Sequence, residues 1–250
     1  MPKNFSPMTT LHLLCAGAAQ GLVKALQAPF EAETGATLQA RFGAVGAMKE
    51  ALLAGEPCDV MIVTEAMIDA LATDGRLQPD TRASLGHVRT GIAVQAGAPH
   101  PIVATPEALK AALLASKAIY FPDPVRATAG IHFARVMQAL GILDTLQPRF
   151  RSYPAGAIAM REMAAAQGPG LIGCTQVTEI NYTPGVELVA ALPKQFELAT
   201  AYSAAAAAGL QSPAQAALAQ RFISLVSGAE SQVLRSAGGF EFPFRKACPS

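Results

Sequence analysis

The sequence predicts an α/β fold built on parallel sheets. Short apolar runs alternate with segments whose apolar residues recur at helical spacing, and very small residues join several runs to the helix that follows. Buried parallel strands appear as continuous apolar runs, and a crossover helix separates each from the next. With 250 residues, of which 51% are hydrophobic, the chain is expected to form one large α/β domain or two smaller ones.

The first strand–loop–helix unit organises the chain. Residues 11–15 are an apolar run, residues 16–21 are small apart from Gln20, and residues 23–30 have helical spacing. Similar units follow at residues 38–53, 118–140 and 171–180. The backbone N–H groups at a helix start are unpaired and carry the positive end of the helix dipole, so such turns can hold small anions. We expect these loops to converge on one anion-binding cleft.

The other elements follow the same alternation. Thr64 is placed to cap the helix after the apolar run DVMIV, and Thr105, Pro106 and Glu107 mark another helix start. Alanine favours a helix over residues 200–209, but this segment lies where a strand would rejoin the first half of the molecule, so we expect a strand. Further strands are expected over 59–63, 91–95, 118–121, 171–174 and 186–193, and further helices over 47–54, 65–72, 131–140, 156–167, 213–227 and 229–237.

Charge and cysteine content exclude several functions. A net charge of +1 favours neither nucleic acid nor an acidic membrane surface as a partner. No apolar run approaches the ~18 residues that cross a bilayer, so no membrane insertion is expected. Cys15, Cys58, Cys174 and Cys248 lie far apart without metal-ligand spacing. We therefore expect no metal and reduced thiols, with two disulfides left open.

The N-terminal residues weakly resemble a secretory leader. Met1-Pro2-Lys3 precedes an apolar stretch over 11–19, and residues 14–16 weakly resemble a lipoprotein cleavage box. The apolar stretch is short, contains His12, and lacks a small residue just before Cys15; its removal would also remove the first strand. We expect a cytoplasmic protein as the sequence stands, and a periplasmic one if a leader has been removed or replaced.

Several motifs, taken in order, match those of one family. They are LCAGA at 14–18, FGAVGA at 42–47, GEPCDV at 55–60, DP at 123–124 with AGIHFA at 129–134, GVELV at 185–189 with LP at 192–193, SGAE at 227–230 and GF at 239–240. Each motif is weak alone, but their order and spacing extend over nearly the whole chain. The chain resembles the molybdate-type solute-binding proteins of ABC transporters. The resemblance implies a two-lobe type II periplasmic-binding-protein fold, in which each lobe is a mostly parallel sheet flanked by helices.

The resemblance also implies the domain organisation and the site. It assigns residues 1–86 plus 199–250 to lobe 1 and residues 87–198 to lobe 2, with the ligand in the cleft between them. Thr64 has the alternative role of helix cap, and Arg126 is either a clamp for a carboxylate or a solvated surface residue. The expected ligand-binding residues are Gly17, Ala18, Ala19, Ala44, Val45, Gly46, Thr64, Arg126, Thr128, Ala129, Gly130, Ile158, Thr175 and Gln176.

Departures from the family pattern favour an organic ligand over molybdate. Family molybdate sites carry serine hydroxyls in the first two loops, where this chain has Ala18 and Val45, and a second-lobe tyrosine where it has Gln176. Each hydrogen-bond donor that is missing lowers the binding free energy of a charged ligand by roughly 1.5–3 kcal/mol. These departures from the family pattern therefore favour a small organic carboxylate as the ligand.

Two functions remain open. The first is a monomeric solute-binding protein for uptake, with an ABC transporter permease as its partner. The alternative is an isomerase of a small unsaturated polycarboxylate, because the resemblance includes a relative that isomerises aconitate. Such an enzyme needs a base near a carbon acid; only Glu179, His132 and Cys174 are candidates, so the catalytic residues stay unassigned. No cofactor or catalytic motif is present, and no cofactor is expected. A ligand-sensing domain is a third class, unsupported by any DNA-binding helix.

Overall fold

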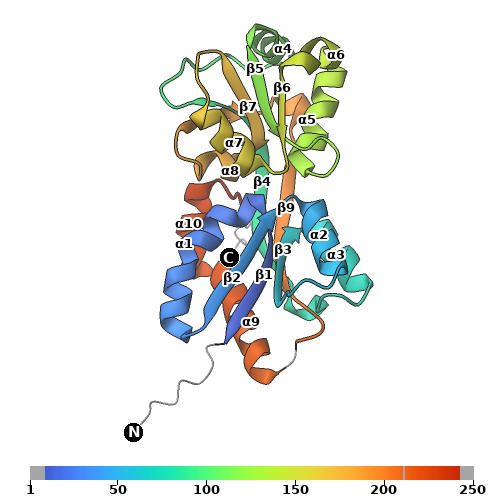
Figure 1. Cartoon of the computed structure of the whole chain (residues 1–250), viewed down its shortest axis with the longest axis vertical. Helices are drawn as coiled ribbons and strands as arrows, with labels where there is room; N and C mark the ends of the chain where they lie inside the picture. Colours follow the sequence, from blue (N-terminus) through green and yellow to red (C-terminus); the bar gives the residue numbers. More distant parts are fainter. Residues whose placement is uncertain (1–8, 211, 243–250) are drawn as a thin grey trace, which may run out of the picture.

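The computed structural model describes residues 9–210 and 212–242 of the chain. They form two α/β lobes stacked along the long axis of the molecule (Figure 1). We call the lobe that contains the N-terminal strand lobe 1 and the other lobe 2. The strands of the described residues form one nine-stranded sheet in the order β2-β1-β3-β9-β4-β7-β5-β6, with β8 paired to β4 beside this path.

Lobe 1 is organised around three parallel strands. β1 pairs with β2 along its whole length, from Thr10 opposite Thr37 to Ala16 opposite Gly43, and with β3 on its other side. β9 then joins β3 in the antiparallel direction. Helices α1, α9 and α10 lie on one side of these strands and α2 and α3 on the other (Figure 1). The elements are β1 (Thr10–Ala16), α1 (Gly17–Thr34), β2 (Thr37–Gly43), α2 (Val45–Leu53), β3 (Val60–Thr64), α3 (Glu65–Thr73), α9 (Pro213–Ser227) and α10 (Gln232–Gly238).

Lobe 2 repeats this arrangement with different strands. β7, β5 and β6 are parallel, and β4 is antiparallel to β7 and also to β8, the other lobe 2 strand that it pairs with. β5 and β7 are buried along their whole length, as expected for strands of a parallel sheet covered on both faces. The elements are α4 (Pro106–Ala115), β5 (Ala118–Pro122), α5 (Thr128–Ala139), α6 (Leu143–Leu146), β6 (Phe150–Tyr153), α7 (Gly156–Ala165), β7 (Leu171–Gln176), α8 (Val177–Asn181) and β8 (Val186–Ala191).

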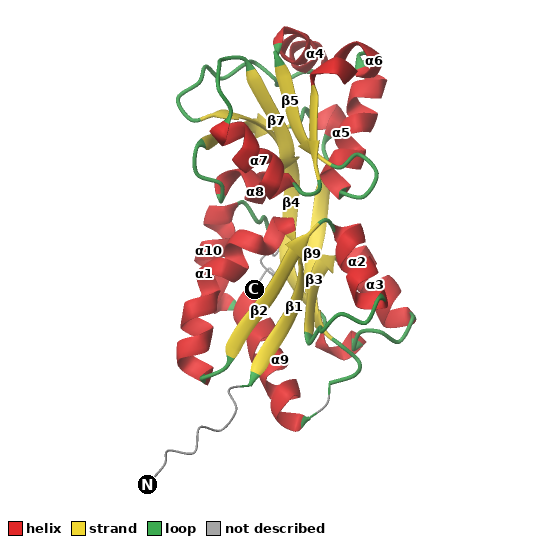
Figure 2. Ribbon diagram, viewed as in Figure 1, coloured by secondary structure: helices red, strands yellow, loops and turns green. Residues whose placement is uncertain are grey.

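Two segments connect the lobes. The first half of β4 (Ala83–Gln95) pairs with β9 (Ala199–Ala206) in lobe 1, and its second half pairs with β7 and β8 in lobe 2. The chain returns to lobe 1 between β8 and β9, and Figure 2 shows β4 and β9 running between the lobes. Each lobe has its own hydrophobic core, and the change between them along β4 falls between Val88 and Ile92.

The direction of the parallel strands brings the functional loops together. β1 and β2 end at the side of lobe 1 that faces lobe 2, and β5 and β6 end at the side of lobe 2 that faces lobe 1 (Figure 1). A helix follows each of these four strand ends, so the starts of α1, α2, α5 and α7 meet between the lobes. Ligands of α/β proteins bind outside the carboxyl ends of the strands for this geometric reason.

The structure differs from the sequence-based expectation in the bounds of several elements. β4 begins at Ala83, well before the expected residue 91. The sequence pattern did not predict its first half, because polar side chains such as His87 and Arg89 alternate there with the buried ones. The short strand β6 and helix α6 were not expected, whereas the strand–loop–helix unit expected over residues 171–180 is present as β7 and α8. The strand expected over residues 200–209 is present as β9, which ends at Ala206, and residues 207–209 lie beyond it. Thr105 does cap α4, but Thr64 makes no capping hydrogen bond to α3.

Candidate anion-binding site

Four helices begin at the cleft without a side-chain cap. The residues in the N-cap positions of α1, α2, α5 and α7 are Ala16, Ala44, Ala127 and Ala155, all with extended backbone angles and none with a capping hydrogen bond. Alanine is a poor cap, typically costing about 1 kcal/mol of helix stability relative to Ser, Thr or Asp. In contrast, α4 and α9 start away from the cleft and are capped by the hydroxyls of Thr105 and Ser212. The starts of α1, α2 and α5 thus keep N–H donors that no cap side chain occupies, whereas at the start of α7 the Ala157 N–H donates to Glu179.

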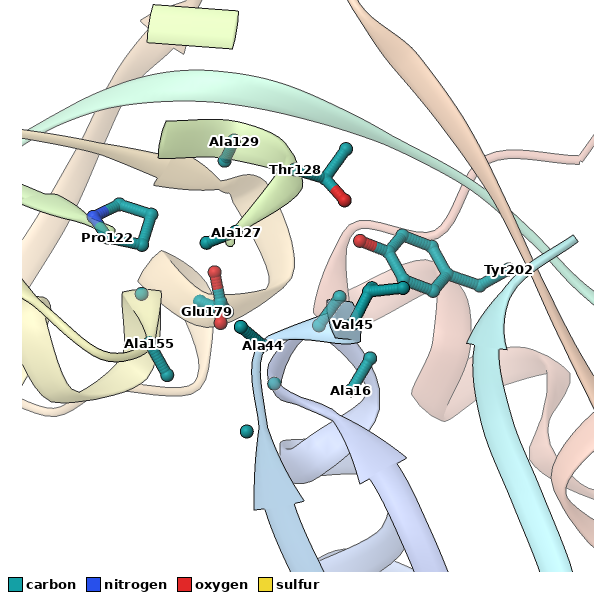
Figure 3. A pocket seen from close by; sticks show the side chains of 14 residues that line it. Ala16, Ala44, Val45, Pro122, Ala127, Thr128, Ala129, Ala155, Glu179 and Tyr202 are labelled. Atoms are coloured by element: carbon teal, nitrogen blue, oxygen red, sulfur yellow. The ribbon is translucent and has the colours of Figure 1, made fainter. Parts of the chain in front are cut away.

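These helix starts surround one small cavity of about 20 Å³, which is room for about one water molecule. A ligand of several atoms therefore needs the two lobes to stand farther apart than they do here. Figure 3 shows the residues from both lobes around it. The lining residues are Ala16, Gly17, Ala18, Gly43, Ala44 and Val45 from the α1 and α2 loops, Pro122, Ala127, Thr128, Ala129, Ala155 and Gly156 from the α5 and α7 loops, and Glu179 and Tyr202.

Glu179 of α8 places a buried carboxyl group in the cavity wall. Its side chain accepts a hydrogen bond from the Thr175 hydroxyl and one from the Ala157 N–H at 3.3 Å. Burial raises the pKa of the Glu179 carboxyl, although these hydrogen bonds oppose the shift. A Cβ atom on Gly17 would lie 2.2 Å from one carboxyl oxygen, and one on Gly156 would lie 2.1 Å from the other. Glycine at both helix starts therefore makes room for Glu179.

Two hydroxyl groups supply further polar atoms. Thr128 stands at the start of α5 and Tyr202 projects from β9, and Figure 3 shows both hydroxyls on the side of the cavity away from Glu179. Tyr202 is 2% exposed, and burial raises the pKa of its hydroxyl, which therefore stays protonated as a donor. Tyr202 was not expected from the sequence; the available signal was one aromatic residue in an alanine-rich strand, TAYSAAAA.

The structure brings six of the expected ligand-binding residues to the cavity wall. They come from the α1, α2 and α5 loops of both lobes, as the strand–loop–helix pattern predicted, and are Gly17, Ala18, Ala44, Val45, Thr128 and Ala129. Gly46 lies next to the cavity, where a Cβ atom would be 3.2 Å from the Arg126 carbonyl oxygen. Binding by these residues stays a prediction, since the structure contains no ligand.

The other expected residues have contacts outside the cavity wall. Ala19 belongs to the lobe 1 core, and Gly130 packs so tightly that a Cβ atom would lie 2.3 Å from two backbone carbonyl oxygens. With its amide oriented to donate, the Gln176 side chain reaches the carbonyl oxygens of Val88 and Arg89 at 3.2 and 3.3 Å. Thr64, Ile158 and Thr175 also lie outside the lining; Thr175 reaches the site only through Glu179.

Arg126 forms an ion pair between the lobes. Its guanidinium contacts Glu50 of α2 in lobe 1, while Arg126 itself precedes α5 in lobe 2. Both side chains are more than half exposed, so the pair contributes little to stability. It is one of the places where the lobes touch, and the carboxylate that Arg126 holds belongs to the protein.

The remaining sequence candidates are not positioned for chemistry in this cavity. The His132 ring bonds to the Phe196 carbonyl oxygen at 2.7 Å. Cys15 and Cys174 are buried free thiols whose pKa is raised by burial, and burial raises the pKa of Cys58 to about 12. Cys248 and the leader-like residues 1–3 lie outside the described residues.

The described residues contain neither a cluster of metal-ligand side chains nor a helix that could span a membrane. Across 9–210 and 212–242, no group of three or more His, Cys, Asp or Glu side chains is placed to hold a metal ion. Within the same ranges, no helix has both the length and the apolar character that a bilayer crossing requires.

Similarity to known proteins agrees with this architecture. Residues 11–241 match the family described as bacterial extracellular solute-binding proteins. The chain belongs to this family. As a solute-binding protein, it has the type II periplasmic-binding-protein fold that its structural relatives share. Structures similar to this one include a molybdate-binding protein, a sulfate-binding protein and a tungstate ABC transporter.

Three relatives show how wide this group is. The periplasmic molybdate-binding protein of Azotobacter vinelandii has a TM-score of 0.75 at 19% identity, covering 93% of this chain and 99% of that one. The sulfate-binding protein SubI of Mycobacterium tuberculosis H37Rv has a TM-score of 0.71 at 16% identity, covering 96% and 88%. An aconitate isomerase of a Pseudomonas species is 26% identical over 231 residues, 90% of this chain and 86% of that protein.

Proposed function

We propose that this solute-binding protein holds a small organic carboxylate in the cavity between its lobes. The observation that carries the proposal is the set of four helix starts around one cavity. They come from both lobes, and each has alanine in the N-cap position and no side-chain cap. Their N–H groups and the hydroxyls of Thr128 and Tyr202 are hydrogen-bond donors suited to an anion. The ordinary role of such a protein would be delivery of its ligand to an ABC transporter permease, from the periplasm.

Glu179 favours a carboxylate over a tetrahedral dianion such as molybdate. An ionised Glu179 would repel any anion held against it, whereas a protonated Glu179 would offer a single O–H donor. A carboxylate ligand pairs well with that single donor, because acid–carboxylate hydrogen bonds are short and strong. Alanine, glycine, valine and proline make up most of the remaining wall, which suits the carbon skeleton of an organic acid.

Lobe closure accompanies binding in this proposal. We propose that the lobes move about the two connections, near residues 87–91 of β4 and 192–199 before β9. The described parts of lobe 1 would then be 9–86 with 199–210 and 212–242, and lobe 2 would be 87–198. Support comes from the two separate hydrophobic cores and from the exposed ion pair that Arg126 and Glu50 form between the lobes.

A thermal-shift panel of anions tests the proposed ligand class. We expect di- and tricarboxylates to raise the Tm by roughly 5–10 °C at about 100 times their Kd, because a ligand that binds only the folded state stabilises it. Molybdate, tungstate and sulfate should produce smaller shifts at equal concentration. A molybdate or tungstate shift of several degrees at micromolar concentration, without a carboxylate shift, would overturn the proposal.

Glu179 also supports a second candidate, an isomerase of an unsaturated polycarboxylate. A buried carboxyl with a raised pKa in a ligand cavity is suited to general acid–base work. In this reaction the Glu179 carboxylate removes a proton from the carbon beside the double bond, and the helix N–H groups stabilise the resulting delocalised anion. The Glu179 carboxylic acid then returns the proton to the other end of the allylic system. The relationship to an aconitate isomerase agrees with this chemistry.

Turnover distinguishes the two candidates. We would incubate the protein with cis-aconitate in deuterated water and follow the vinyl and methylene signals by NMR. The isomerase proposal predicts conversion that is lost in Glu179→Gln while the Tm shift by the substrate remains. Binding without conversion by the wild-type protein would leave solute binding as the function.

A further inference from the structure

A second cavity lies beside the first and shares part of its wall. It is lined by residues from α1, α7 and α8, and Gly17 and Glu179 belong to the walls of both cavities. Its volume of about 170 Å³ exceeds that of the first cavity, about 20 Å³. Since α1 belongs to lobe 1 and α7 to lobe 2, this side cavity also lies between the lobes (Figure 1).

The side cavity has the cations that the first cavity lacks. Lys24 of α1 and Arg161 of α7 are exposed residues that line it, one from each lobe. No Lys or Arg lines the first cavity. Within the described residues neither Lys24 nor Arg161 forms an ion pair, whereas Arg41, Arg82 and Arg126 do. The Lys24 ammonium lies 5.8 Å from the centre of the Phe42 ring, a contact that leaves its charge uncompensated.

A buried polar group points to the same cavity. Thr178 lines the side cavity and is 0% exposed, and its hydroxyl has no hydrogen-bond partner among the described residues. Buried hydroxyls are nearly always paired, so an unpaired one calls for an explanation. Gln20 lines the same cavity and offers an amide donor. Two cations from opposite lobes and neutral donors form a receptor for negatively charged oxygen atoms.

We propose that the side cavity binds a second acid group of the ligand, so that the natural ligand is a di- or tricarboxylate that lies across both cavities. This inference rests on the proposed function, since the first carboxylate is held at the helix starts. The second carboxylate lies between Lys24 and Arg161, and the ligand passes Glu179, the residue that both cavities share. Each lobe then contributes one cation, so the second acid group also favours the closed arrangement of the lobes.

Isothermal titration with three saturated acids tests this inference. Propane-1,2,3-tricarboxylate, glutarate and butyrate carry three, two and one carboxylates and cannot isomerise. For the wild-type protein we expect affinity to rise with the number of carboxylates and one ligand to bind per chain. We expect Lys24→Met and Arg161→Gln each to weaken tricarboxylate binding about tenfold and to change butyrate binding less than twofold.

Matched variants control for general electrostatics. Lys110→Met and Arg135→Gln remove exposed cations of α4 and α5, neither of which lines either cavity, and should leave all three affinities unchanged. Tricarboxylate affinity that is equal in Lys24→Met, Arg161→Gln and wild type would overturn the side-cavity inference and leave the proposed function intact. Two tricarboxylates bound per chain would also overturn it. If no carboxylate binds to the wild-type protein, the proposed function fails as well.

Discussion

At the scale of single residues, Glu179 determines much of what this cavity can hold. Its carboxyl group occupies the space that side chains on Gly17 and Gly156 would fill. It also accepts a hydrogen bond from the Ala157 N–H, a donor that an anionic ligand would otherwise use. The pattern of small residues in the loops was readable from the sequence. The approach of Glu179 to those loops was not, because it depends on how α8 packs against α1 and α7 in three dimensions.

Replacement of Glu179 by Gln should stabilise the protein in a pH-dependent way. The pKa of this carboxyl is raised by burial, so wild-type stability is highest below the unfolded-state pKa and falls as pH rises through the folded-state pKa. Glu179→Gln lacks this loss, so the difference in Tm between variant and wild type should grow with pH, to at least about 2 °C at neutral pH. Glu162→Gln, at an exposed position of α7, is the control. Parallel Tm profiles for wild type and Glu179→Gln would contradict the assigned burial.

At the scale of elements, the starts of four helices form the proposed binding site. Sequence patterns predicted the strand–loop–helix units correctly because buried strands and amphipathic helices leave strong local signals. They missed the first half of β4 and the edge strand β6, whose exposed and polar residues such as Arg89 and Arg151 weaken that signal. The role of alanine at the N-cap positions becomes visible only when the four helix starts are seen to share a cavity.

A capping side chain introduced at the start of α2 should raise the stability of the protein and weaken ligand binding. We expect Ala44→Asp to cap α2, to raise the stability of the ligand-free protein by about 0.5–1 kcal/mol, and to weaken carboxylate binding at least tenfold. The new carboxylate would occupy the α2 N–H groups and repel an anionic ligand. Chemical denaturation and isothermal titration measure the two effects.

The matched control acts at a helix that starts away from the cleft. Ser212→Ala removes the existing cap of α9 and should lower stability by about 1 kcal/mol without a change in carboxylate affinity. If Ala44→Asp leaves carboxylate affinity unchanged, the start of α2 does not take part in binding.

At the scale of the whole molecule, the fold places two opposed sets of strand ends around one gap. The family resemblance implied this two-lobe fold, which no local pattern could establish. The Arg126–Glu50 pair and the side cavity both join groups that are far apart in the sequence, and therefore needed the folded structure. In the proposed function, the closed lobes bring the helix starts and the cations of the side cavity to the same ligand.

Amide chemical-shift mapping tests the central claim most directly, because the proposed donors are backbone groups that side-chain substitution cannot remove. During titration of ¹⁵N-labelled protein with propane-1,2,3-tricarboxylate, the amide signals of Gly17, Val45 and Thr128 should shift together with one common Kd. The Ala108 and Gln215 amides, which are already bonded to the Thr105 and Ser212 caps, should not move. Saturable shifts confined to residues outside the cleft, with the Gly17, Val45 and Thr128 signals unchanged, would contradict the account.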